Sequence, residues 1–100
     1  MQEISIGCSV HYALSGADIE RINTARASRN ESHFNSHAIG QLVPFTVVVV
    51  WPDEYGEGAP SVNGQALLDG NDSLWVTSAR EGDEPGTWRW PEIKDTKKAK

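Results

Sequence analysis

Apolar residues recur at every second position in several short segments of this chain, which is the period of a β-strand with one buried face. Residues 7–14 form the first of these segments, and residues 62–68 and 73–78 form two more. The intervening Asp-Gly-Asn-Asp sequence, residues 69–72, is rich in residues that tolerate positive φ. We therefore predict three strands, the last two joined by a tight hairpin.

Two further strands are predicted from β-branched and aromatic residues. Residues 43–51 are too few for a typical buried helix and strongly favour a central strand that is apolar on both faces at its far end. Pro44 belongs at an edge of that strand or at its first position, because proline donates no ladder hydrogen bond. Residues 87–90 alternate so that Trp88 and Trp90 share one face of a short final strand.

A helix is predicted over residues 15–28. Ser15 is a suitable N-cap and Asp18 stands three residues later, as in a capping box. Ile19 and Ile22 recur at helical spacing but form a narrow apolar stripe, so the helix should lie on a surface.

Five short strands around one helical insertion predict a mainly β protein in a chain of 100 residues. We expect a small five-stranded antiparallel barrel of the SH3-like or OB-like type, since closing a sheet removes its exposed edges. One domain would span residues 1–92, and residues 93–100 would form a flexible lysine-rich tail.

Composition narrows the classes of partner. The net charge is −5, with acids gathered at residues 53–57 and 81–84, which disfavours duplex nucleic acid as a partner of the folded part. The longest apolar run, residues 47–51, is far shorter than a membrane span, so no membrane association is expected. A single cysteine, Cys8, and the absence of a visible secretory signal fit a reducing cytosol.

Four segments and three helical positions together resemble a family of small proteins encoded by tailed bacteriophages of actinobacteria and other hosts. The segments are residues 10–15, 62–65, 68–78 and 85–92, and the helical positions are Asp18, Ile22 and Asn23. The resemblance covers most of residues 9–92, and its most specific parts are LDGNDSLWVTS and GTWRWPE. It departs from the family pattern around residues 30–40, where members usually carry a longer insert, and in the tail. It implies a phage accessory protein acting in the host cytoplasm or on the virion, and it carries over no catalytic residue.

Two clusters of side chains are candidate metal sites. His33 and His37 stand four residues apart, but they lie in a serine- and asparagine-rich stretch without a nearby acid or cysteine at ligand spacing. Asp69, Asn71 and Asp72 resemble the start of a calcium loop, but no distal glutamate follows before the next strand. We therefore predict no metal site and regard the second cluster as a hairpin turn.

Candidate nucleophiles are present without the surroundings that activate them. A Ser/His/Asp or Cys/His catalytic arrangement could be drawn from Cys8, Ser9, His11 and Asp69. However, no strand-turn-helix elbow surrounds either nucleophile. No glycine-rich phosphate loop precedes a helix either. The sequence therefore favours a protein that is not an enzyme and needs no cofactor, with Cys8 as a small buried residue.

Tryptophan is abundant, with four residues in 100, and a shallow core hides only some of them. We expect Trp51 and Trp88 in the core and the other two at the ends of the barrel. If those two are exposed, they form an aromatic surface suited to stacking on a base or gripping a partner chain. The candidate binding residues on these strands are Trp75, Trp90, Arg89, Asn63, Gln65 and Asn71.

Arginines recur along the predicted helix. Arg21, Arg26 and Arg29 could share one face toward its C-terminal end, where such a row is most often solvated. In an acidic protein, Arg21 and Arg26 are also candidates for binding a phosphate or carboxylate.

These observations lead to two functional hypotheses. The first is a phage accessory binding protein that inhibits or sequesters a host component without catalysis, either a defence protein or a nucleotide-like signal, in the host cytoplasm. The alternative is a structural protein of the virion that docks on another subunit through a sheet edge or the lysine-rich tail. In both cases exposed strand edges and aromatic residues favour a homo-oligomer.

Overall fold

The computed structural model describes residues 3–29, 36–51, 60–70 and 72–92. The described chain forms one helix and five strands. In chain order these are β1 (Ser9–Ala13), α1 (Gly16–Ser28), β2 (Leu42–Trp51), β3 (Ser61–Leu67), β4 (Ser73–Ala79) and β5 (Trp88–Arg89). The tail predicted at residues 93–100 lies outside the described residues. Among the described residues, no helix combines the length and the apolar character needed to cross a membrane.

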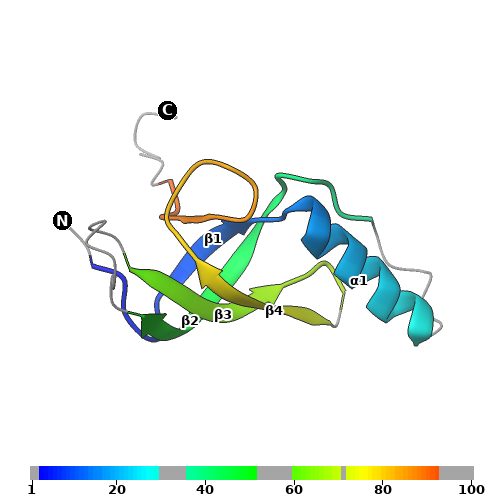
Figure 1. Ribbon diagram of the computed structural model, residues 1–100, viewed down its shortest axis with the longest axis horizontal. Helices are drawn as coiled ribbons and strands as arrows, with labels where there is room; N and C mark the ends of the chain where they lie inside the picture. Colours follow the sequence, from blue (N-terminus) through cyan, green and yellow to red (C-terminus); the bar gives the residue numbers. More distant parts are fainter. Residues whose placement is uncertain (1–2, 30–35, 52–59, 71, 93–100) are drawn as a thin grey trace, which may run out of the picture.

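The five strands form one antiparallel sheet in the order β4-β3-β2-β1-β5, with α1 beside the end that holds the β3–β4 hairpin (Figure 1). The prediction of a mainly β protein with one short helix is confirmed. The sheet is not closed into a barrel, so the expected SH3-like or OB-like barrel is not confirmed. Strand β5 has only two residues, and it meets the chain that follows β4 through an isolated bridge between Glu81 and Trp88.

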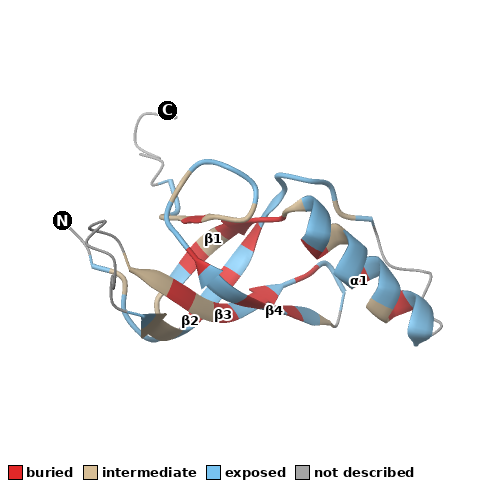
Figure 2. Ribbon diagram, in the orientation of Figure 1, coloured by how far each residue is buried: buried red, intermediate tan, exposed pale blue. Residues whose placement is uncertain are grey.

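The core lies on one face of the sheet, and its residues alternate with exposed ones as a half-buried strand requires (Figure 2). In β2, Val43, Phe45 and Val47 are buried, while the far end of the strand is half-buried or exposed. The prediction of a central strand is confirmed, because β2 is the middle strand of the sheet, but the apolar residues at its far end are not fully buried. The largest fully buried side chain is Trp88, which closes the core at the β5 edge.

Pro44 lies inside β2, opposite His11 of β1, and not at the first or edge position that the sequence predicted. The pairing of β2 with β3 begins at Phe45, which faces Ala66. Pro44 therefore stands just beyond the β2–β3 ladder, so its missing N–H removes no bond from that ladder.

Helix α1 begins as the sequence predicts. The Ser15 hydroxyl accepts a hydrogen bond from the Asp18 N–H, and the Asp18 carboxylate accepts one from the Ser15 N–H, which completes the capping box. The same carboxylate accepts a 2.5 Å hydrogen bond from the buried Tyr12 hydroxyl. Together with Ile22, which is buried in the core, these bonds attach the first half of the helix to the sheet.

The bond between Tyr12 and Asp18 leads to a stability prediction. Burial, and then the hydrogen bond to Asp18, raise the pKa of Tyr12 above its ordinary value of 10.0. Folding therefore favours the neutral phenol, and this contribution is present below pH 10.0 and lost as pH rises above it. We expect Tyr12→Phe to lower the free energy of unfolding by about 1–2 kcal/mol at neutral pH. The free energy of unfolding of the variant should also fall less at alkaline pH than that of the wild type. Urea denaturation across pH measures both effects.

Candidate functional site

An open pocket of about 560 Å³ lies at the edge of the sheet formed by β1 and β5. Its lining comes from both strands, the start of β2 and the segments on either side of β5. The lining residues are His11, Leu42, Glu81, Asp83, Arg89, Trp90 and Glu92. Two candidate binding residues, Arg89 and Trp90, are thus brought together with His11, which faces Arg89 across the β1–β5 ladder.

The aromatic wall of the pocket is held by the core. Trp90 is half-buried, and its ring meets the ring of the buried Trp88 edge to face, with centroids 5.5 Å apart and an interplanar angle of 85°. This geometry is a favourable arrangement for two aromatic rings. The Trp88 ring in the core therefore supports the Trp90 ring in the lining of the pocket. Trp90 follows the end of β5, so the shared strand face predicted for the two tryptophans stays a prediction.

Arg89 supplies the donor of the pocket. Its Nε is buried and has no hydrogen-bond partner among the described residues. A buried N–H without an acceptor is unfavourable by about 1–3 kcal/mol, so an acceptor supplied by a bound partner would remove this penalty. Arg89 is half-buried and lines the pocket.

The charge of the pocket is set by its rim. Glu81, Asp83 and Glu92 are exposed carboxylates, against which the lining offers one guanidinium and one imidazole. Three carboxylates therefore stand against a single guanidinium in the lining. The rim therefore attracts cations and repels phosphates.

Trp75 and Gln65 lie at the opposite edge of the sheet. They face each other across the β3–β4 ladder, and Trp75 is 41% exposed. These two residues do not contribute to the pocket, because three strands (β3, β2 and β1) lie between β4 and β5 in the sheet. Asn71 lies outside the described residues.

Asn63 has a structural role. Its Oδ1 accepts a 2.8 Å hydrogen bond from the Ser78 N–H, at an irregularity where the β3–β4 register shifts. Ser78 has a φ of 57°, so the chain of β4 bends there and needs a local acceptor. We therefore attribute this side chain to the bulge and not to a binding surface.

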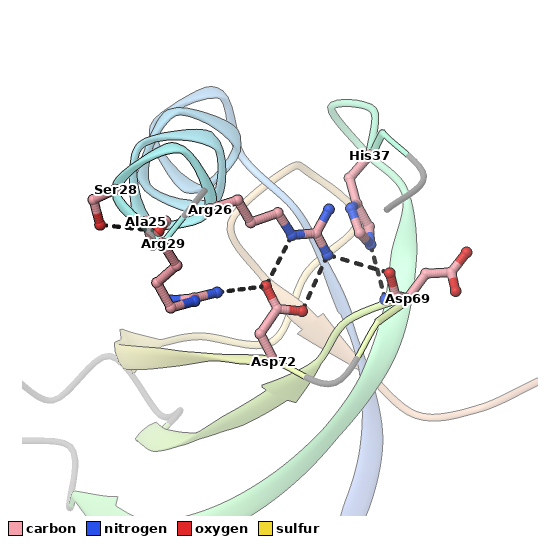
Figure 3. A network of polar contacts seen from close by, with 7 residues as sticks. All are labelled: Ala25, Arg26, Ser28, Arg29, His37, Asp69 and Asp72. Carbon is pink, nitrogen blue, oxygen red and sulfur yellow. Dashed lines mark hydrogen bonds and ion pairs between the residues drawn. The ribbon is translucent and has the colours of Figure 1, made fainter. Parts of the chain in front are cut away.

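Arg26 is engaged inside the protein, at the C-terminal end of α1 (Figure 3). Its guanidinium is buried and binds both oxygens of Asp72, with Nε 2.8 Å from Oδ2 and Nη2 3.1 Å from Oδ1. Nη2 also donates to the Asp69 carbonyl at 3.2 Å. The hydrogen bond from Arg26 lowers the pKa of Asp72. The carboxylate that this arginine binds therefore belongs to the β3–β4 hairpin, and Arg26 is not available for a ligand.

The other helical arginines are exposed. Arg29 reaches the same Asp72 carboxylate at 3.4 Å, and Arg21 lies 4.0 Å from Asp18. The three arginines therefore do not act as one row, because Arg26 is buried and Arg21 pairs with a separate acid.

His37 also stabilises the hairpin. Its Nε2 accepts a 3.1 Å hydrogen bond from the Asp69 N–H, which joins the segment before β2 to the β3–β4 turn (Figure 3). His33 falls outside the described residues. Within the described ranges, no group of three potential ligand side chains is placed to hold a metal ion.

One core assignment made from the sequence is wrong, and part of the pocket was missed. Trp51, expected in the core, is 45% exposed because it ends β2, where Ser61 is its neighbour on β3. The rim acids and His11 were not predicted as pocket residues. The alternation of β1 does place His11 on the face opposite to Tyr12, but only the register of β1 with β5 brings it beside Arg89.

Comparisons with protein-family models, with curated proteins and with solved structures find no match to this chain.

Proposed function

We propose that this protein is a non-catalytic binding protein of bacteriophage origin that captures a protein of the host cell and blocks it. The phage origin rests on the resemblance of residues 68–78 and 86–92 to tailed-phage proteins. The binding role is carried by the pocket, in which a fixed aromatic ring, an unpartnered guanidinium N–H and three carboxylates converge. Convergent polar groups around an aromatic wall are typical of a recognition site.

The charge of the pocket favours a protein partner over a nucleotide. A lysine or arginine side chain lying over Trp90 would be attracted by the face of the ring and by the carboxylates of Glu81, Asp83 and Glu92. A backbone carbonyl of the same partner would accept a hydrogen bond from the Arg89 Nε–H. A nucleotide could stack on Trp90, but its phosphates would meet the same three carboxylates.

Neutralising the rim tests this proposal. The triple variant Glu81→Gln, Asp83→Asn, Glu92→Gln should bind a short arginine-rich peptide about tenfold more weakly than the wild type, because three exposed charge pairs contribute roughly 0.5 kcal/mol each. The measurement is isothermal titration at low salt, and added salt should weaken wild-type binding further.

The matched control removes three negative charges outside the pocket. Glu3, Glu20 and Glu84 are exposed and do not line the pocket, and Glu84 lies in the same loop as Asp83. Their triple replacement by glutamine should leave the peptide affinity within about twofold of the wild type if the rim acts locally. Equal losses in both triple variants, or tighter binding of a nucleoside monophosphate than of the peptide, would contradict the proposal.

A role in the virion is the second candidate, because the free edge of β4 could add to a sheet of another subunit. Mass spectrometry of purified phage particles separates the two functions. A stoichiometric copy number in the particle supports the virion role, and absence from the particle supports a role in the host cell.

A further inference from the structure

Strand β4 ends the sheet, and its irregularity at Ser78 lies near its C-terminal end, so the preceding residues form a regular edge. Within the described part of the chain, β4 pairs with β3 on one side and with no strand on the other. Its seven residues, Ser73–Ala79, include no charged residue and no proline. Such an edge is a template for pairing with another strand.

The hydrogen-bond pattern shows which groups the edge presents. The Leu68 N–H donates to the Asp72 carbonyl, so this pair is hydrogen-bonded and the pattern alternates from there along the ladder. Leu74 and Val76 therefore direct their backbone groups to β3. Ser73, Trp75 and Thr77 direct theirs to the free edge.

The regular part of this edge is symmetric about Trp75. Beyond Thr77, Ser78 adopts a φ of 57° and donates to Asn63, so the ladder becomes irregular there. At the other end, Asp72 is bound by Arg26. The edge available for pairing is thus residues 73–77, with Trp75 at its centre.

We propose that a second copy of this chain pairs with β4 in antiparallel orientation, about a two-fold axis at Trp75. Trp75 then faces the partner's Trp75, and Ser73 faces the partner's Thr77. Ser73, Trp75 and Thr77 of both copies would exchange about six N–H···O bonds. The two copies would form one continuous ten-stranded sheet, twice the five strands of a single copy.

Self-complementarity identifies the occupant as a second copy. The chain carries a net charge of −5, so two copies repel each other over most of their surface. In this register no charged residues oppose each other along residues 73–77. Hydroxyls face hydroxyls, the two indole rings lie side by side, and Leu74 lies beside the partner's Val76 on the core face.

The dimer does not depend on the proposed function, because it uses the edge opposite to the pocket. If both hold, the two pockets lie at the far ends of the continuous sheet. Such a dimer would bind a partner that presents repeated basic segments more tightly than either pocket alone.

The first test uses the unaltered protein. Sedimentation equilibrium should give a dimer, and amide hydrogen exchange of Ser73, Trp75 and Thr77 should slow as the protein concentration rises. The Leu74 and Val76 amides are an internal control, because their bonds to β3 protect them at every concentration. A monomer throughout the accessible concentration range, or exchange at Ser73, Trp75 and Thr77 that does not depend on concentration, would overturn the proposal.

The second test uses matched variants. Trp75→Lys places two ammonium groups opposite each other at the axis and should weaken dimerisation by roughly a hundredfold. Val48→Lys is the control, because Val48 is 42% exposed on the sheet but lies on β2, away from the edge. A dimer that persists in Trp75→Lys, or one that is lost equally in Val48→Lys, would overturn the assignment.

A backbone variant covers the case in which Trp75→Lys does not fold. Thr77→Pro removes one outward N–H per copy and leaves every bond to β3 in place. It should weaken the dimer while the unfolding midpoint of the monomer stays unchanged. Unchanged dimerisation would contradict pairing along this edge.

Discussion

Asp72→Asn is expected to lower the free energy of unfolding by about 3 kcal/mol at neutral pH, because it leaves the buried Arg26 guanidinium without its counter-charge. The pair joins the end of α1 to the β3–β4 hairpin, so the loss should be accompanied by fraying of the helix. Urea denaturation followed by far-ultraviolet circular dichroism measures both effects.

Arg29→Ala is the matched control for this variant. Arg29 binds the same Asp72 carboxylate but its side chain is 45% exposed, so its removal should change stability by less than about 1 kcal/mol. Similar losses in Arg29→Ala and Asp72→Asn would show that burial does not determine the strength of this network.

The Asp72 carboxylate should also make the stability of the protein depend on pH in the acid range. The pKa of Asp72 is lowered below its ordinary 3.8, chiefly by the hydrogen bond from Arg26. Its contribution to stability is therefore present above pH 3.8 and is lost as pH falls through the lower pKa of the folded state. The wild type should lose this part of its stability in acid. Asp72→Asn should lack this part of the loss, and an identical acid dependence in the two proteins would contradict the assignment.

Gly64→Ala is expected to destabilise the protein by about 3 kcal/mol or more, because the added methyl group has no space in the sheet. A Cβ at this position would lie 2.2 Å from the Thr46 carbonyl oxygen and 2.7 Å from Phe45 Cζ. The first contact is with backbone of the neighbouring strand β2, so relief requires the two strands to separate. Thermal and urea unfolding provide the measurement.

Gly16→Ala is the control for the glycine substitution. Gly16 begins α1, and a Cβ there would meet Ile39 Cδ1 at an ordinary 3.6 Å. Alanine is the better helix former, so this variant should be neutral or more stable by up to about 1 kcal/mol. Destabilisation by both variants to a similar extent would indicate that the close approach at Gly64 is not the cause.

Period and capping signals were sufficient to predict the elements themselves. The alternation of β1, β3 and β4 and the capping box at Ser15 are local, because each depends on residues a few positions apart. The strand order could not be predicted in this way. Whether β4 meets β5 depends on where the chain between them runs, and no local pattern in residues 80–87 specifies that path.

The roles of individual side chains were likewise predictable only where they depend on local sequence. Arg26 looked like its exposed neighbours Arg21 and Arg29, since arginine spacing on a helix does not reveal which residue faces an acid 46 positions away in the chain. Trp90 and Arg89 were identified from their residue type, but the carboxylates that give their pocket its charge come from segments on both sides of β5.

The sequence by itself determined the mainly β composition, the capped helix and the alternation of β1, β3 and β4, because these follow from backbone periods and contacts between near neighbours. The tertiary structure decided that the sheet stays open, that Arg26 is held by Asp72 and that Trp75 is exposed at an edge. It also decided which side chains form the pocket. These outcomes depend on register and on pairing between distant segments, where many arrangements satisfy the same local pattern and only the packed chain selects one.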